Sequence, residues 1–238
     1  MTVLIKKIAA TMGLSISRRD RVLELVPSDY LQSPFLPRIH RKSLGRTLYF
    51  THMFERAAGV PGDIVECGTS VGHGILLWAL LCDLAHVDRT VWGFDSFSGF
   101  PEPTAADGRP DGSQAIQRGK YRTPPEIVQR VLTDGGVSPH RLRDRVRIIK
   151  GFFDDSLSEH QGAIAILHLD CDLYDSYRTC LEALYDKVSR GGLILFDEYR
   201  DDNHPGCRRA VDEFFRDKPE KPVEYCRYQY SRHYVVKP

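Results

Sequence analysis

Short apolar runs alternate with longer segments of helical period from residue 62 onward. Seven of these runs, many of them rich in β-branched residues, predict strands at residues 63–67, 90–95, 145–150, 163–170, 193–197, 223–228 and 233–237. Strands that alternate with helices form βαβ units, whose strands pair in parallel. The pattern therefore predicts an α/β fold with a seven-stranded, mostly parallel sheet and helices on both faces.

The predicted helices have recognisable ends. Residues 72–85 form a nearly continuous apolar run, and residues 173–188 carry apolar side chains at helical spacing before Gly191 and Gly192. Pro205 suits the first turn of a further helix, because its missing N–H is not needed there.

Two segments depart from this alternation. Residues 99–123 are rich in Pro, Gly and charged side chains and show little periodicity, so we expect them to form a lid. Residues 1–60 hold helix-like segments with breaks at Pro27 and at 34–37, and they predict an N-terminal helical arm. Residues 61–238 form the predicted main domain.

The composition narrows the class of protein. There are 33 Lys and Arg against 32 Asp and Glu, a formal net charge of +1, so no basic field favours nucleic acid or an anionic membrane as a partner. The apolar runs are shorter than the roughly 18 residues that span a bilayer, and Lys6 and Lys7 interrupt any signal-peptide core. The six cysteines contain no C-x-x-C pair. We expect a reduced, cytoplasmic protein.

The first predicted strand leads into a glycine loop. Its sequence is Glu66-Cys67-Gly68-Thr69-Ser70-Val71-Gly72-His73-Gly74. Ligands of open parallel sheets bind at the carboxyl ends of the strands, and free N–H groups at a helix start favour an anion. The loop lacks the G-x-G-x-x-G spacing of dinucleotide binders, which counts against NAD. Asp95 ends the second predicted strand beside this loop, where it can accept both hydroxyls of a ribose.

Acidic residues gather at the ends of the fourth and fifth predicted strands. Asp170 and Asp172 follow the fourth, and Asp197 and Glu198 follow the fifth. Two such charges 4 Å apart repel by about 4 kcal/mol at an effective dielectric of 20. A hard divalent cation such as Mg²⁺ would neutralise them. The alternative is that they cap helices or pair with arginines, for which Arg178, Arg208 and Arg209 are the candidates.

These residues belong to ordered blocks that resemble a known family. The blocks are Asp63-Ile64-Val65-Glu66-Cys67-Gly68, Gly93-Phe94-Asp95-Ser96-Phe97, Gly99-Phe100-Pro101, Gly119-Lys120-Tyr121, Pro125-Glu126-Ile127-Val128, residues 146–157, His168-Leu169-Asp170-Cys171-Asp172-Leu173-Tyr174 and residues 191–199. From about Gly62 to Phe215, the chain resembles the macrocin O-methyltransferase (TylF/MycF) family of S-adenosylmethionine-dependent enzymes, which have the class I methyltransferase (Rossmann-like) fold.

The resemblance implies a cofactor site. In such enzymes, the residues matching Glu66, Gly68 and Gly72 hold the methionine end of S-adenosylmethionine, and the acid matching Asp95 binds its ribose. The predicted set is completed by Thr69, Ser70 and Ser96 in the same loops and by Asp154 and Asp155 near the adenine.

The resemblance also implies a metal. Carboxylates matching Asp170, Asp197 and Glu198 bind Mg²⁺, which holds the acceptor hydroxyl. The best-described members carry Asp-Asp-Tyr where this chain has Asp197-Glu198-Tyr199, and Glu is one methylene longer.

Methyl transfer to a hydroxyl needs alignment and a base, because a neutral hydroxyl is a poor nucleophile. Asp172 is the first candidate, since it lies beside the predicted ligand Asp170, and together they form the family's D-x-D segment. His204 is the second, because the loop after the fifth strand can reach the same face. The expected acceptor is a small molecule, such as a natural-product sugar.

Two other functions stay open at this level. Asp170-Cys171-Asp172 is formally the D-x-D of a metal-dependent nucleotide-sugar glycosyltransferase. A non-catalytic cofactor-binding module is the other alternative. The sequence leaves open whether the protein is a homo-oligomer.

Overall fold

The computed structural model describes residues 14–19, 22–27, 41–109, 111, 113 and 116–238. The chain divides into two compact units, residues 1–36 and 37–238, which are described separately.

The first unit holds a two-stranded antiparallel sheet. Strand β1 (Leu14–Arg19) pairs with β2 (Val22–Pro27), and Leu14 lies opposite Pro27. The prediction of a helical arm is therefore wrong for these residues. Leu-Ser-Ile-Ser and Leu-Glu-Leu alternate apolar and polar positions with a period of two, which is typical of strands. Residues 1–13, 20–21 and 28–40 of the predicted arm lie outside the described residues.

The second unit is built on a seven-stranded sheet, as the sequence predicts. Its strands are β3 (Asp63–Cys67), β4 (Val91–Asp95), β5 (Val146–Lys150), β6 (Ile164–Leu169), β7 (Val188–Phe196), β8 (Val223–Arg227) and β9 (Tyr230–Val236), in the order β5-β4-β3-β6-β7-β9-β8. The first five of these pair in parallel, and β9 runs antiparallel to both β7 and β8.

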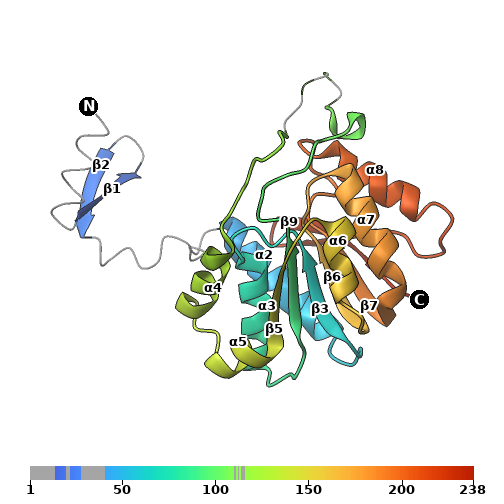
Figure 1. Ribbon diagram of the computed structural model, residues 1–238, viewed down its shortest axis with the longest axis horizontal. Coiled ribbons are helices and arrows are strands. Elements are labelled where there is room, and N and C mark those ends of the chain that lie inside the picture. Colours follow the sequence, from blue (N-terminus) through green and yellow to red (C-terminus); the bar gives the residue numbers. More distant parts are fainter. Residues whose placement is uncertain (1–13, 20–21, 28–40, 110, 112, 114–115) are drawn as a thin grey trace. The chain divides into compact units, whose positions relative to one another are not determined.

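Helices cover both faces of this sheet. They are α2 (Arg41–Arg56), α3 (His73–Leu84), α4 (Pro125–Asp134), α5 (Pro139–Arg145), α6 (Phe153–Ser156), α7 (Tyr174–Leu184) and α8 (Pro205–Phe214). Figure 1 shows α2 to α5 on one side of the sheet and α6 to α8 on the other. Every residue of β6 is buried, as expected for a central parallel strand covered by helices on both sides.

The order of the strands positions the site. The chain builds β3, β4 and β5 outward in one direction and then returns to place β6 on the other side of β3. Ligands of doubly wound sheets bind at the carboxyl ends of the strands beside such a reversal.

The boundary between one predicted helix and the strand after it differs in the structure. The helix expected over 173–188 ends at Leu184, and β7 begins at Val188, so Gly191 lies inside a strand. Gly191 has a φ of +78°, and its N–H donates to the carbonyl of Lys237. The start of β7 is placed in the sheet by the parallel pairing of Val188 with Ile164 of β6, before a register shift that precedes Leu193.

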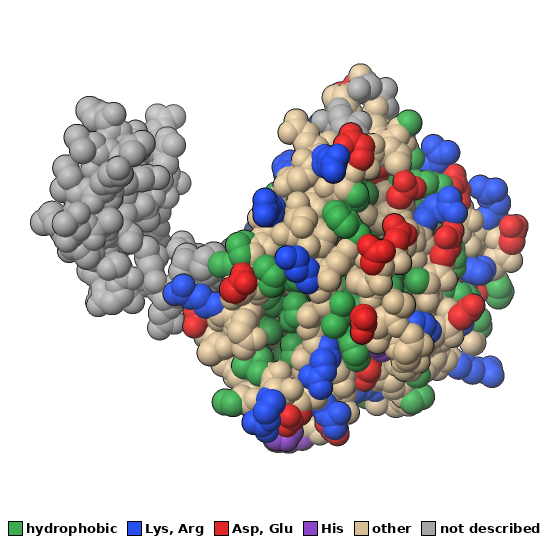
Figure 2. Space-filling model, viewed as in Figure 1, with side chains coloured by type: hydrophobic (Ala, Val, Ile, Leu, Met, Phe, Trp, Pro, Cys, Tyr) green, Lys and Arg blue, Asp and Glu red, His purple; other side chains and the backbone are tan. Residues whose placement is uncertain are grey.

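The surface of the second unit mixes both signs of charge. On the described part of the face in Figure 2, Lys and Arg side chains are interspersed with Asp and Glu, in line with the balanced composition. No helix among the described residues is long and apolar enough to cross a membrane.

Candidate active site

A cavity of about 940 Å³ opens at the carboxyl ends of β3, β4, β6 and β7. Of the residues predicted from the sequence, Glu66, Gly68, Thr69, Ser70, Asp95, Ser96, Asp170, Asp172, Asp197, Glu198 and His204 line it. A volume near the upper end of ordinary ligand pockets can hold a cofactor together with a second small molecule.

Gly68 lets two strand ends pass each other closely. Its φ is +96°, and a Cβ at this position would lie 1.8 Å from the backbone oxygen of Asp170. Its N–H donates to the carbonyl of Phe94, while the N–H of Asp170 donates to the carbonyl of Cys67. The glycine loop is thus tied to both β4 and β6, and any other residue in its place would clash with backbone.

Glu66 and His168 form a buried pair under the glycine loop. They are adjacent in the parallel register of β3 and β6, and Nδ1 of His168 lies 2.9 Å from Oε2 of Glu66. Each side chain is only 1% exposed. A Cβ on Gly74 would lie 2.0 Å from the same Oε2, so α3 packs its first turn directly on this carboxylate.

Asp95 is held by the backbone of two loops. Ser70 N–H donates to its Oδ2 over 2.8 Å, and Phe97 N–H donates to its Oδ1 over 2.7 Å. Burial raises the pKa of Asp95, and the two N–H groups oppose that rise by stabilising the carboxylate. Asp95 lines the cavity, and a carboxylate has about four acceptor sites on its two oxygens.

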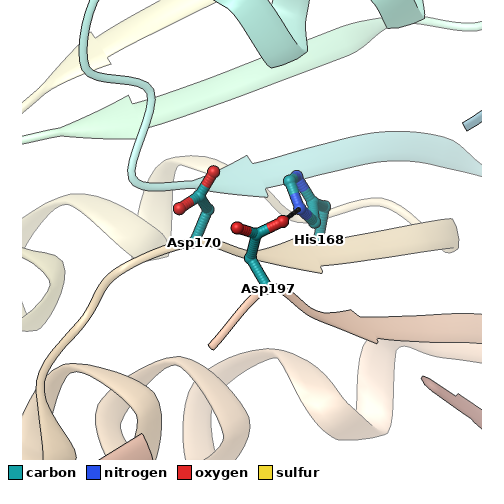
Figure 3. A group of neighbouring side chains, drawn as sticks. All are labelled: His168, Asp170 and Asp197. Atoms are coloured by element: carbon teal, nitrogen blue, oxygen red, sulfur yellow. Dashed lines mark ion pairs between the residues drawn. The ribbon is translucent and has the colours of Figure 1, made fainter. Parts of the chain in front are cut away.

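Figure 3 shows three side chains that lie close together. His168 belongs to β6, and Asp170 and Asp197 directly follow β6 and β7. One ligand-type atom of each lies within 4.8 Å of the others. Nε2 of His168 is buried, has no hydrogen-bond partner among the described residues and lies 4.0 Å from Oδ1 of Asp197. This group differs from the predicted metal set, because it contains His168 and not Glu198.

Two arginines neutralise the two aspartates. Arg46 of α2 donates from Nη2 to Oδ2 of Asp170 over 2.7 Å, and its Nη1 lies 3.9 Å from Oδ1 of Asp197. Arg232 of β9 donates from Nε and Nη2 to the two oxygens of Asp197 over 3.0 and 3.3 Å. Although burial alone would raise the pKa of Asp197, Arg46 and Arg232 hold it well below its usual value.

Glu198 contacts both Asp170 of this group, through a side-chain hydrogen bond, and Tyr177. Tyr177 places its hydroxyl 2.7 Å from Oε2 of Glu198 and 2.9 Å from the carbonyl of Leu169. Burial and the carboxylates of Asp170 and Asp172 raise the pKa of Glu198 well above its usual value. One hydroxyl proton cannot serve two acceptors, so a protonated Glu198 completes the network.

Asp172 and His204 form a second polar pair in the cavity. Nε2 of His204 lies 3.1 Å from Oδ1 of Asp172, and its Nδ1 lies 3.3 Å from Oδ2 of Asp201. Burial, with Asp170 and Asp197 nearby, raises the pKa of Asp172 to about 7. Asp172 has a φ of +61°, a conformation that Asp tolerates better than most residues.

Asp107 anchors the predicted lid. It is 1% exposed and accepts hydrogen bonds from the N–H of Thr104 and from the N–H of Tyr174 at the start of α7. Arg109 adds a contact to Asn203. Phe100, Lys120 and Tyr121 of the segment line the cavity. The lid role of residues 99–123 stays a prediction, and residues 110, 112, 114 and 115 lie outside the described part.

Three predicted residues do not line the cavity. Asp154 and Asp155 are exposed, and Oδ1 of Asp154 accepts from Thr179 instead. Gly72 has a φ of +91° at the start of α3, and a Cβ there would lie 2.8 Å from Cγ1 of Val128. Phe152 and Phe153, next to the two aspartates, are the residues of that segment that do line it.

The arginines at the carboxylates are not the ones expected from the sequence. Arg178, Arg208 and Arg209 instead pair with acids four positions on, at Glu182, Asp212 and Glu213. That four-residue spacing is visible in the sequence and could have excluded these arginines as partners of the strand-end carboxylates. Arg46 lies 124 positions from Asp170, and no local motif marks it or Arg232.

The chain is similar in sequence to known O-methyltransferases. A family model described as Macrocin-O-methyltransferase (TylF) matches residues 50–224. The chain is 36% identical over 162 residues to the 8-demethyl-8-(2,3-dimethoxy-alpha-L-rhamnosyl)-tetracenomycin-C 4'-O-methyltransferase of Streptomyces olivaceus. It is 33% identical over 164 residues to the Mycinamicin III 3''-O-methyltransferase of Micromonospora griseorubida. Each match covers 66% of this chain but only 59% and 61% of the two relatives, less than two thirds of their length.

Solved structures show the same fold. The O-methyltransferase NovP is similar with a TM-score of 0.71 and 27% identity, over 99% of this chain and 97% of that chain. CalS11, a calicheamicin methyltransferase, also gives a TM-score of 0.71, at 21% identity over 83% of this chain and 80% of its own.

Proposed function

The chain belongs to the macrocin O-methyltransferase (TylF) family, and on that premise we propose that it transfers a methyl group from S-adenosylmethionine to a hydroxyl of a small molecule such as a natural-product sugar. The observation that carries the proposal is the pairing of two half-sites in one cavity. The glycine loop and Asp95 form the first half, and the polar residues that follow β6 and β7 form the second.

The first half-site fits the methyl donor. Asp95 lines the cavity with acceptor capacity beyond its bonds to Ser70 and Phe97, which suits the ribose hydroxyls, and Ser96 lines the cavity beside it. Glu66, Gly68, Thr69 and Ser70 are proposed to hold the methionine end, with Gly72 shaping their loop. A contribution of Asp154 and Asp155 at the adenine stays a prediction of the sequence.

The second half-site fits activation of the acceptor. When bound, S-adenosylmethionine supplies an electrophilic methyl group, whose S–C bond breaks as the new O–C bond forms. Asp172 and His204 lie 3.1 Å apart in the same cavity, and we propose that this pair takes the acceptor's proton. Closure of residues 99–123 over the cavity would exclude water.

The residues present do not fit the predicted Mg²⁺. Asp170 and Asp197 already accept charge-assisted hydrogen bonds from Arg46 and Arg232, and Glu198 lies against Tyr177. The third nearby ligand atom is an imidazole nitrogen, which suits transition metals better than Mg²⁺. Mg²⁺ is therefore not part of the proposed function, and no step above runs through it.

Isothermal titration with S-adenosylhomocysteine tests the first half of the proposal. A screen of methyl transfer from labelled S-adenosylmethionine to deoxysugar-bearing and catechol acceptors then tests the second. Binding without transfer to any acceptor would favour a non-catalytic module. Stabilisation by a nucleotide sugar in place of S-adenosylhomocysteine would favour a glycosyltransferase. Cytoplasmic location and homo-oligomer formation stay predictions.

A further inference from the structure

We propose that Arg46 takes the place of a divalent cation between Asp170 and Asp197, so that the site neutralises its own carboxylates and works without a metal ion. The proposal rests on the proposed function, because it takes this cavity to be the site of methyl transfer. Its main test, metal binding, does not depend on that function.

The position of the Arg46 guanidinium is the first observation. One nitrogen lies 2.7 Å from Asp170, at the end of β6, and the other lies 3.9 Å from Asp197, at the end of β7. A cation that bridged these strand ends would need the same two carboxylates. The guanidinium therefore competes with any metal for its ligand atoms.

The balance of charge is the second observation. Asp170 and Asp197 carry two negative charges, while Arg46 and Arg232 carry two positive ones, with Arg46 contacting Asp170 and Arg232 contacting Asp197. An added divalent cation would find no uncompensated carboxylate in this pair and would be repelled by both guanidinium groups. Glu198, the third predicted ligand, is engaged by Tyr177.

The packing of α2 keeps Arg46 in place. Tyr49 and Phe50, on the same helix, are buried, and the guanidinium carbon lies 5.2 Å from the centre of the Phe50 ring. A Cβ on Gly45 would lie 2.7 Å from the ring of Tyr230, so the helix rests directly on β9. Arg46 is thus built into the wall of the cavity on a rigid element.

The chemistry balances without a metal. The acceptor proton passes to the Asp172–His204 pair, the acceptor oxygen bonds the methyl carbon, and sulfur keeps the electron pair of the broken S–C bond. The role left to Arg46 is to hold Asp170 and Asp197 in place and to cancel their charge beside the reacting oxygen. Arg46 is therefore a positioning residue.

The test is a titration of the chelator-stripped full chain with Mn²⁺, in saturating S-adenosylhomocysteine, followed by the signal of free Mn²⁺ in electron paramagnetic resonance. We expect the wild type to leave the free signal unchanged. Arg46→Met, which removes the charge but keeps a similar length, should bind stoichiometric Mn²⁺ at least about tenfold more tightly than the wild type. Adding Asp170→Asn to Arg46→Met should abolish the gained binding.

Control variants separate the effect of the Arg46 charge from an effect on the folded structure. Arg46→Lys keeps the charge and should bind no Mn²⁺. Arg41→Met removes a charge from the same helix at an exposed contact with Gln229 and should also leave Mn²⁺ free. If thermal unfolding shows that Arg46→Met does not fold, Arg46→Gln replaces it, with the same gain of binding expected.

Stoichiometric Mn²⁺ binding by the wild type, as tight as that of the neutral variants, would overturn the proposal. So would neutral variants that fold but bind no more Mn²⁺ than the wild type. Once an acceptor is known, chelator-stripped wild type should keep its turnover, and Arg46→Met should lose at least about tenfold. Affinity for S-adenosylhomocysteine, measured on the same samples, shows separately whether the proposed function fails.

Discussion

Replacing Asp95 with alanine should weaken binding of S-adenosylhomocysteine about 5- to 150-fold. The carboxylate accepts backbone N–H groups from Ser70 and Phe97, and its remaining acceptor capacity is proposed to bind a ribose hydroxyl. Removing the partner of such hydrogen bonds costs about 1–3 kcal/mol in total, and about 1.4 kcal/mol corresponds to a factor of ten in affinity. The fold should survive, because Ser70 is exposed enough for water to replace the carboxylate.

Asp95→Asn makes the test sharper. Its amide keeps one acceptor oxygen but turns an NH₂ group toward the N–H of Ser70 or Phe97, so two donors would face each other. We therefore expect asparagine not to restore affinity. Isothermal titration of both variants measures the loss, and Asp186→Ala, at a side chain 96% exposed near the opposite end of β7, is the control. An unchanged affinity in Asp95→Ala, with an intact thermal transition, would refute the reasoning.

Three further changes probe other parts of the site. Gly74→Ala should lower affinity for S-adenosylhomocysteine at least about tenfold in the same titration, because the new Cβ would lie 2.0 Å from Oε2 of Glu66. Asp172→Asn should lower kcat about 10²- to 10⁴-fold in steady-state kinetics and leave cofactor affinity unchanged, because it removes the proposed base. Asp107→Ala should destabilise the fold by about 1–3 kcal/mol in thermal unfolding and speed tryptic cleavage after Arg109.

Two of these changes have a matched control variant. Gly59→Ala adds a methyl group with nothing within 4 Å, and it should change no affinity. Asp111→Ala removes an exposed acid from the same segment as Asp107 and should leave cleavage unchanged. A kcat for Asp172→Asn equal to that of the wild type would assign the base elsewhere. Cleavage after Arg109 at one rate, with and without S-adenosylhomocysteine and acceptor, would contradict a closing lid.

The sheet could be predicted from the sequence because its signals are local. An apolar run such as Ile164–Leu169 is buried on both faces, so its composition marks it as a central strand without knowledge of its neighbours. The hairpin at Leu14–Arg19 and Val22–Pro27 has only a weak period-two pattern, and the prediction of a helix failed there. The start of β7 was missed for another reason, since Val188 is paired with Ile164 of β6 across a register shift, and the residues between carry no strand pattern.

The residues of the site likewise fall into those that local sequence signals predict and those that they do not. Asp95, Asp170 and Asp197 end predicted strands, so their meeting at one edge follows from parallel pairing. Arg46 and Arg232 reach them through tertiary packing, from a helix and an antiparallel strand whose sequences carry no site motif. Charge repulsion correctly indicated that something must neutralise the carboxylates, but it could not say what.

The distribution of these charges along the chain bears on how the protein is made. The ribosome delivers Arg46 first, then the two aspartates, and Arg232 last. Until β9 is synthesised and pairs with β7, Asp197 lacks the guanidinium that contacts both of its oxygens. A carboxylate that loses its partner resists burial, so this edge of the sheet should stay hydrated and loosely packed in the nascent chain. We therefore expect the pocket to form only after residue 232 has left the ribosome, so that an incomplete translation product would lack a formed site.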